Sequence, residues 1–302
     1  MLEMVIDARR GDLGNGFAIQ RILPFRNRRM VGPFIFMDHA GPIALPPGEI
    51  RKADVKPHPH IGLSTVSYLF NGRITHRDSL GVEHTIRPGE VNWMTAGRGI
   101  AHSERFEDPA ELAAGGALEM MQTWVALPEQ HEEDAPSFEN YQPEQLPTFE
   151  DGSVWMRLIA GNAYGVSNDV KTLSPLFYLH AVLQPGARCG LPHGHVERAA
   201  YVAEGVIEVD GHEYRRGQML VFGRQDDPVI VAKSHATVML LGGEPLGERF
   251  IWWNFVSSRK DRIEQAKADW KAGRIELPPN DNQEYIPLPA DHLKAPTIEP
   301  IS

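Results

Sequence analysis

The chemistry that this sequence could carry is concentrated in two short pairs of side chains. His58 and His60 stand two residues apart in the run 56–60, and His102 and Glu104 stand two residues apart farther along. Residues two apart in an extended strand point to the same face, so each pair presents its side chains together. Three imidazoles and one carboxylate suit a divalent transition metal ion. We therefore expect His58, His60, His102 and Glu104 to bind one metal ion, with positions left open for water or a substrate.

The context of each pair helps to separate a metal site from ordinary polar strand residues. A single His-x-His pair is weak evidence, because such side chains are also common on exposed strands. Here the second pair follows the glycine-rich run 95–99, while Pro57 and Pro59 stiffen the first pair and remove two backbone donors. The two pairs together favour the metal site over the exposed-strand alternative.

A further His-x-His pair, His193 and His195, lies in the later part of the chain. The region expected to correspond to His102, residues 220–222, contains no histidine, and Arg198 near the pair would repel a cation. Two imidazoles alone bind a divalent ion weakly. We expect this pair to be a hydrogen-bonded polar pair or a remnant of a duplicated site, and the sequence leaves open whether it binds anything.

Short apolar runs separated by turn residues predict an antiparallel, all-β fold. Residues 66–70 and 73–77 predict two strands joined at the turn Asn71-Gly72, and similar patterns recur over residues 177–222. Many short strands at regular spacing are typical of sandwiches and barrels. Because both halves contain a His-x-His pair, a glycine turn and further strands in similar order, we predict a duplication of one antiparallel unit, which is a sandwich or a barrel.

The predicted linker between the two halves is the segment 128–150, which is rich in Glu, Pro and Gln. We predict a metal-binding N-terminal domain over residues 1–135. The predicted C-terminal domain covers residues 136–302 and includes a short helix and an extended, proline-rich tail. The charged run 131–134 is expected to be a solvated part of the linker.

Two further features carry expectations of their own. The predicted helix near the C-terminus is capped by Ser257 or Ser258 and ends at Gly273. His76 and His84 follow the first turn, and we expect them to be solvent-exposed strand residues, with the mouth of the barrel as the alternative.

The composition is that of an ordinary folded protein and argues against several functional classes. Of 302 residues, 42% are hydrophobic and 23% are charged, and the formal net charge is −10. This negative balance argues against direct nucleic-acid binding, although a protein partner stays open. The single cysteine, Cys189, cannot form an internal disulfide or a thiolate zinc site. We find no secretory signal and no apolar run of about 18 residues, so we expect a cytoplasmic protein without a membrane span.

Three segments resemble the pirin family of bicupins: KPHPHIGLSTVSYLFNGRITHRDSLG, RPGEVNWMTAGRGIAHSE and GERFIWWNFVSS. The resemblance extends from about Arg21 to about Ile275, and the run TAGRGIAHSE is a highly specific part of it. It implies two cupin barrels in tandem, each made of two antiparallel sheets, with a single Fe²⁺ ion in the N-terminal barrel. The residues that match the family's metal ligands are His58, His60, His102 and Glu104.

The resemblance also implies two kinds of function. Some bacterial members resemble quercetin 2,3-dioxygenases, which use dioxygen to open the central ring of a flavonol. In that case Glu104, the only carboxylate in the set, is the candidate for accepting the flavonol hydroxyl proton. Other members resemble iron-dependent redox sensors that bind a transcription factor or a metabolic enzyme.

We favour the enzyme, because the metal set is complete and no docking motif is evident. Another small-molecule reaction on the same fold stays an alternative. The ligand types alone leave the metal open among Fe, Ni, Cu, Mn and Zn, and the resemblance favours Fe²⁺. We expect a flavonol-like substrate, dioxygen and a monomeric protein.

Overall fold

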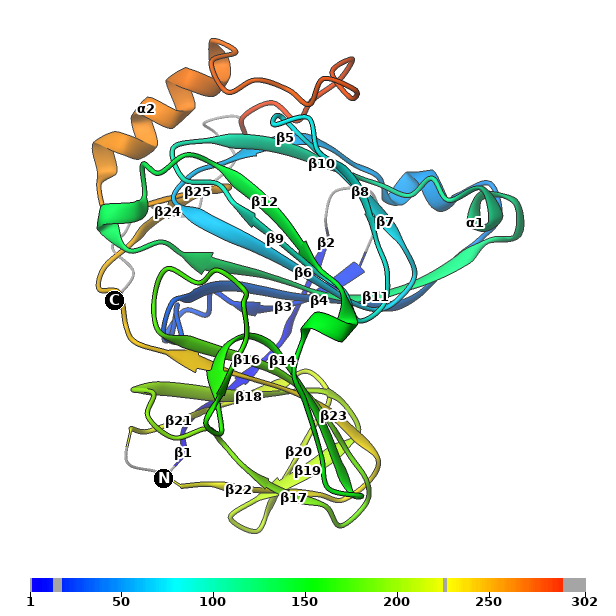
Figure 1. Cartoon of the computed structure of the whole chain (residues 1–302), viewed down its shortest axis with the longest axis vertical. Helices are drawn as coiled ribbons and strands as arrows, with labels where there is room; N and C mark the ends of the chain where they lie inside the picture. The colour runs from blue at the N-terminus through cyan, green and yellow to red at the C-terminus, as the bar shows by residue number, and fades with distance from the viewer. Residues whose placement is uncertain (1, 13–17, 225–226, 290–302) are drawn as a thin grey trace. The chain divides into compact units, whose positions relative to one another are not determined.

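The computed structural model in Figure 1 describes residues 2–12, 18–224 and 227–289. By its internal contacts the chain divides into two compact units. Unit 1 comprises residues 1–10, 20–39 and 141–246, and unit 2 comprises residues 11–19, 40–140 and 247–302. Each unit draws on distant parts of the chain, whereas the predicted domains 1–135 and 136–302 are contiguous.

Strands make up most of the described residues. In chain order they are β1 (Leu2–Asp7), β2 (Arg9–Asp12), β3 (Ala18–Leu23), β4 (Phe34–Leu45), β5 (Val55–His60), β6 (Leu63–Asn71), β7 (Ile74–Asp78), β8 (Glu83–Ile86), β9 (Val91–Thr95), β10 (Ile100–Arg105), β11 (Gly116–Ala126), β12 (Ser137–Tyr141), β13 (Thr148–Glu150), β14 (Val154–Ala163), β15 (Val166–Ser167), β16 (Leu176–Leu183), β17 (Arg188–Gly190), β18 (Glu197–Glu204), β19 (Val206–Val209), β20 (His212–Arg215), β21 (Gln218–Phe222), β22 (Val229–Ala232), β23 (Ala236–Gly243), β24 (Phe250–Trp252) and β25 (Phe255–Ser257). The helices are α1 (Pro109–Ala114), α2 (Lys260–Lys271) and the short 3-10 helices η1 (Ile50–Ala53), η2 (Glu129–His131) and η3 (Pro143–Gln145).

Unit 2 contains a four-stranded sheet with the order β5-β10-β7-β8. The sheet with the order β12-β9-β6-β11-β4-β3-β2 also belongs mainly to unit 2, although unit 1 includes residues 20–23 of β3 and 34–39 of β4, and β24 and β25 form a separate hairpin. Leu69 and Met120 of the larger sheet pack with Ile74 and Ile86 of the smaller one in a single apolar cluster. The two sheets therefore enclose a barrel interior (Figure 1).

Unit 1 repeats this arrangement. Its larger sheet has the order β1-β21-β18-β23-β16-β14-β13, with β15 beside β14, and its smaller sheet has the order β17-β22-β19-β20. Apolar side chains from both sheets, such as Leu179, Leu220, Ile207 and Ile230, form one buried cluster. The predicted all-β class and the prediction of two related barrels are confirmed.

The turn at Asn71-Gly72 does not close a hairpin as predicted, because its two flanking strands belong to different sheets. β6 pairs with β9 and β11, whereas β7 pairs with β10 and β8. Gly72 has a φ of +89°, and a β-carbon there would lie 2.4 Å from the carbonyl oxygen of Ala117 in β11. This glycine therefore lets the chain pass close to β11 as it crosses from one sheet to the other.

Helix α2 lies where the sequence predicts a helix, and Gly273, with a φ of +67°, follows its end. Ile263 and Trp270 on one face of α2 are buried with Phe255 of β25, so the helix is part of unit 2. Among the described residues, no helix has both the length and the apolar character that crossing a membrane requires.

The predicted serine cap of α2 is wrong, because the residue at the N-cap is Arg259 and its side chain makes no capping bond. The hydroxyl groups of Ser257 and Ser258 instead donate to the carboxylate of Glu132, at 2.8 and 3.1 Å. Glu132 is buried and also forms an ion pair with Arg249 at 3.1 Å. The expectation of a solvated run over residues 131–134 is therefore wrong for Glu132, whose buried carboxylate fixes the start of α2, whereas Glu133 and Asp134 are exposed.

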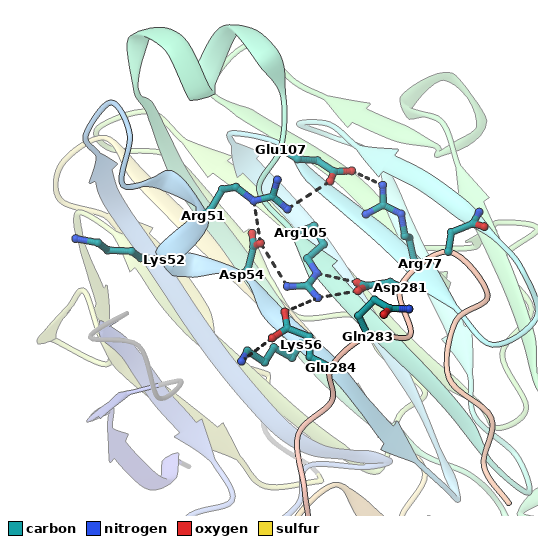
Figure 2. Close-up of a pocket in the computed structure, with 11 residues that line it drawn as sticks. Arg51, Lys52, Asp54, Lys56, Arg77, Arg105, Glu107, Asp281, Gln283 and Glu284 are labelled. Atoms are coloured by element: carbon teal, nitrogen blue, oxygen red, sulfur yellow. Dashed lines mark hydrogen bonds and ion pairs between the residues drawn. The ribbon is translucent and has the colours of Figure 1, made fainter. Parts of the chain in front are cut away.

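Charged residues on the outer face of the four-stranded sheet line a cavity of about 870 Å³ (Figure 2). Arg105 of β10 lies at its centre and is itself buried. Its guanidinium nitrogens lie 2.7 Å from Asp281, 3.1 Å from Glu284 and 3.4 Å from Asp54. Asp281 and Glu284 belong to the segment after α2, so Arg105 attaches that segment to the sheet.

The same segment also contacts β5. The ammonium of Lys56 pairs with Glu284 at 2.7 Å, and the backbone amide of Ile286 donates to the carbonyl oxygen of Pro57 at 2.8 Å. The indole of Trp270 in α2 donates to the carbonyl oxygen of Ile286 at 3.0 Å. Residues 281–286 therefore lie across β5 and β10 from outside, while residues 290–302 of the predicted tail lie outside the described residues.

Arg105→Met is expected to lower the free energy of unfolding by about 3 kcal/mol, because Asp281 loses the guanidinium that pairs with both of its oxygens and buried Asp54 loses one cation while keeping its contact with Arg51. Urea denaturation followed by circular dichroism measures this change. The matched control is Lys52→Met, which removes an exposed pair with Glu49 and is expected to change stability little. Equal stability of the two variants would contradict an attachment through Arg105.

Candidate metal centre

The three candidate histidines meet because of the register between two antiparallel strands. His102 of β10 lies opposite His58 of β5, and Ile100 lies opposite His60. Residues that face each other across a sheet point to the same side, and residues two apart in a strand do so as well. All three imidazoles therefore enter the interior of the barrel in unit 2.

A register shift between β5 and β10 separates the inward histidines from the outward cations. Val55 and His58 are three residues apart, but they lie opposite Glu104 and His102, which are two apart. The extra residue on β5 falls next to Pro57, which has no amide proton to lose from the ladder. Lys56 accordingly reaches the outer cavity although it precedes His58 by only two residues (Figure 2).

The three rings form a compact and buried group. Their centroids lie 5.0 Å apart for His58 and His60, 4.4 Å for His58 and His102, and 5.0 Å for His60 and His102. One nitrogen from each ring lies within 4.8 Å of those of the other two. The side chains are 7%, 1% and 2% exposed in the same order of residues. This three-histidine cluster could hold one metal ion.

Burial keeps these rings in the uncharged form that binds metals. It lowers the pKa of His58 to about 4, although the hydrogen bond to the Lys56 carbonyl acts in the opposite direction. Burial also lowers the pKa values of His60 and His102 well below the ordinary value, and the neighbouring His58 adds to both effects. The three imidazoles are therefore neutral at neutral pH and do not have to release protons to accept a metal.

The hydrogen bonds around the cluster leave nitrogen lone pairs without a protein donor. Nδ1 of His58 lies 2.8 Å from the carbonyl oxygen of Lys56, which can only accept, so the lone pair of the neutral ring is on Nε2. Nε2 of His102 has no hydrogen-bond partner. The ring of His60 makes no bond of ordinary geometry at either nitrogen, and only the backbone of Asn254 acts on it as a weak partner. A buried nitrogen without a partner, such as Nε2 of His102, costs about 1–3 kcal/mol, and a metal ion would satisfy it.

Glu104 lies beside this cluster but not within it. Its carboxylate is not among the ligand atoms that lie within 4.8 Å of one another. It faces His76 across the sheet, and burial raises the pKa of Glu104 to about 7 although the side chain keeps some access to solvent. The structure thus brings three of the four predicted ligands together, and Glu104 as the fourth ligand stays a prediction.

His76 is the residue near the cluster that the sequence interpretation missed. The expectation of an exposed strand histidine is wrong, because His76 is buried with its Nδ1 3.3 Å from Nδ1 of His102. Its ring stacks on Phe138 with centroids 4.4 Å apart and planes 21° apart. His84, directly opposite His76, is partly exposed and bonds to Glu90 at 3.1 Å. No local sequence pattern shows that β7 pairs with β10, so only the spacing of His76 and Asp78 could have drawn attention to this residue.

Apolar side chains of the larger sheet close the other side of the cluster. The ring of Trp124 in β11 lies 5.2 Å from that of His60, nearly perpendicular to it. Met94 of β9 shares a face with Trp124, because both lie in register with Thr65 of β6. Phe138 of β12 packs with Met94. The candidate centre is therefore bounded by histidines on one sheet and by large apolar side chains on the other.

The corresponding region of unit 1 differs in its residues but not in its strand order. The counterpart of β10 is β22, which lies between β17 and β19 as β10 lies between β5 and β7. The expectation that residues 220–222 correspond to His102 is therefore wrong, since β21 takes the place of β9. His193 is exposed and lies 3.7 Å from Asp227, whereas Nε2 of His195 bonds to the carbonyl oxygen of Asn162 at 3.1 Å.

Comparisons with known proteins agree with this architecture. Residues 16–125 match the pirin domain, and residues 178–276 match the pirin C-terminal cupin domain. A pirin-like protein of Caulobacter vibrioides is 58% identical over 290 residues, which cover 96% of this chain and 100% of that protein.

Solved structures give the same result. A quercetin 2,3-dioxygenase from Acinetobacter baumannii superposes with a TM-score of 0.87 at 32% identity, covering 97% of this chain and 98% of the other. A second structure of that name from the same species gives a TM-score of 0.83 at 27% identity, covering 91% and 98%. The chain therefore belongs to the pirin family and contains two cupin domains.

Proposed function

We propose that this protein is a mononuclear, metal-dependent dioxygenase that opens the central ring of a flavonol with dioxygen. The observation that carries the proposal is the buried cluster of three neutral histidines with nitrogens that lack a protein donor. The similarity to two structures named quercetin 2,3-dioxygenase supports the choice of substrate class.

In this proposal His58, His60 and His102 hold the ion, Glu104 is the fourth ligand, and the ion is Fe²⁺. Imidazole nitrogens suit several divalent transition metals, and a carboxylate adds a negative charge that favours a divalent cation. When bound, the ion supplies Lewis acidity that lowers the pKa of a flavonol hydroxyl group.

The residues around the cluster have separate tasks in the reaction. Glu104 accepts the proton of the flavonol hydroxyl, because it is the only carboxylate in the proposed set. Trp124, Met94 and Phe138 offer an apolar wall against which a flat aromatic substrate packs. The same wall keeps bulk water from the reacting atoms.

The enzyme is expected to consume quercetin only in its metal-loaded form, as a loss of visible absorbance together with dioxygen uptake. Glu104→Gln is expected to lower kcat by about 100-fold, because the variant loses both the proton acceptor and the charged fourth ligand. Glu111→Gln, in helix α1, serves as the control and should retain full activity. Unchanged quercetin absorbance with metal-loaded wild-type protein would refute the proposed reaction.

His102→Ala is expected to remove the metal, and His195→Ala is its matched control because that histidine lies in the other barrel. Elemental analysis should give about one metal ion per chain for wild type and His195→Ala, and almost none for His102→Ala. Far-UV circular dichroism should remain unchanged, because both barrels have apolar cores of their own. Full metal content in His102→Ala would exclude the site.

Removal of the metal is expected to lower the melting temperature without unfolding the protein at 25 °C. A metal that binds only the folded state adds about 2.7 kcal/mol when its free concentration is about 100 times Kd. Differential scanning calorimetry of chelated and reloaded protein measures this change. Identical curves would mean that the ion does not bind the folded protein preferentially.

A further inference from the structure

His102 is connected to two buried residues that the proposed mechanism does not use. Its Nδ1 lies 3.3 Å from Nδ1 of His76, and Nε2 of His76 lies 3.0 Å from the carboxylate of Asp78. All three side chains are buried, and Asp78 is fully so. The three residues form a continuous line that ends at a candidate metal ligand.

The direction of each hydrogen bond follows from Asp78. Its Oδ1 accepts from the backbone amides of Leu80 at 2.9 Å and Val82 at 3.2 Å, and its Oδ2 faces Nε2 of His76. An ionised carboxylate only accepts, so Nε2 of His76 must donate to it. In a neutral ring the other nitrogen, Nδ1, is then an acceptor, so Nδ1 of His102 must donate to it. The lone pair of His102 is accordingly on Nε2, the nitrogen that lacks a protein partner.

We propose that His76 and Asp78 are positioning residues that hold His102 in the tautomer whose Nε2 can bind a metal. This inference rests on the proposed metal site, but it makes its own prediction about the metal-free protein. The surroundings restrict both residues: Phe138 stacks on the ring of His76, and the two amide bonds fix the carboxylate of Asp78 in the β7–β8 hairpin.

The three candidate ligands differ in which group determines the ring nitrogen that carries the proton. This difference makes the proposal specific to His102. His58 relies on the backbone carbonyl of Lys56, which no substitution of a side chain removes. His60 makes no hydrogen bond of ordinary geometry at its ring. His102 alone among the three depends on side chains, so a change at position 76 or 78 should act through this ligand.

Asp78→Asn is the sharpest test. It reverses the direction of the hydrogen bonds from residue 78 through His76 to His102, and the new side chain has the same shape as the old one. The amides of Leu80 and Val82 require the carbonyl oxygen of the new side chain at the Oδ1 position, which places its NH₂ group toward His76. His76 must then accept at Nε2 and donate from Nδ1, and His102 must accept at Nδ1. The proton of neutral His102 moves to Nε2, where it blocks metal binding.

Two measurements test this reversal. Long-range ¹H–¹⁵N correlation spectra of the metal-free protein distinguish the two tautomers of His102, and titration with Co²⁺ measures metal affinity from the absorption of the bound ion. Wild type is expected to show the Nδ1–H tautomer, and Asp78→Asn the Nε2–H tautomer. The affinity of Asp78→Asn for Co²⁺ should fall by about 10- to 100-fold.

A pair of variants at position 76 separates hydrogen bonding from packing. His76→Asn keeps an acceptor near the place of Nδ1 and is expected to retain most of the affinity for Co²⁺. His76→Phe keeps a ring against Phe138 but no acceptor, and should lose affinity as Asp78→Asn does. Glu90→Gln is the matched control, because Glu90 is a buried carboxylate bonded to a histidine, His84, that is not a candidate ligand.

The outcomes are distinguishable from those of the proposed function, since none of these measurements uses quercetin or dioxygen. An Nε2–H tautomer of His102 in metal-free wild type would overturn the positioning role. Wild-type Co²⁺ affinity in both Asp78→Asn and His76→Phe would also overturn it. A wild-type protein that shows the expected tautomer and affinities but leaves quercetin intact would support the positioning role and refute only the proposed reaction.

Discussion

The register between β5 and β10 is the constraint on which the candidate site depends. A slip of one residue would turn either strand over and send its histidines to the outer face. Ion pairs on the outer face oppose such a slip. Arg105 points outward, whereas His102 and Glu104 on the same strand point inward, and the guanidinium of Arg105 pairs with Asp281 at 2.7 Å. On β5, at the register shift, Lys56 also points outward, and its ion pair with Glu284 opposes a slip of that strand. The ion pairs behind the sheet and the imidazoles inside the barrel therefore specify one alignment of the same two strands.

This arrangement places polar groups in a part of the barrel where apolar packing would be more stabilising. The interior of unit 2 contains a hydrogen-bonded layer next to the histidines, in which Ser67 bonds to Gln122 and Asn140 bonds to Asn92, each at 2.8 Å. Only beyond this layer does the apolar cluster around Leu69 and Met120 begin. Buried polar groups are tolerated when they bond to one another, whereas the rings of His60 and His102 each keep a nitrogen lone pair with no side-chain donor. Their lone pairs are the part of the interior that only a ligand would complete.

The sequence predicted what depends on short-range spacing. Two-residue alternation on a strand placed His58 with His60, and turn residues gave the all-β class and the duplication.

What depends on strand pairing was not predictable from local patterns. Asn71-Gly72 has the composition of a hairpin turn but crosses between sheets, because the partners of β6 and β7 lie elsewhere in the chain. His76 is buried because its strand, β7, pairs with β10 within the four-stranded sheet. Glu132 is a charged residue in a charged run, yet it is buried because Ser257, Ser258 and Arg249 surround its carboxylate.

The two barrels show that strand order alone does not create the site. β22 occupies in unit 1 the place that β10 occupies in unit 2, but its residues are Val229, Ile230, Val231 and Ala232. Ile230 and Ala232 point inward and join an apolar cluster that also contains residues of β16, β18 and β21. Apolar side chains therefore occupy the interior of unit 1 at the position where His102 and Glu104 enter the interior of unit 2. At that position a barrel of this size can contain apolar core side chains or metal-binding side chains, but not both. The difference between the two units thus lies in a few inward-facing residues on one strand. Sequence spacing was therefore enough to identify the histidines, whereas the fold was needed to identify the strand that lies opposite them.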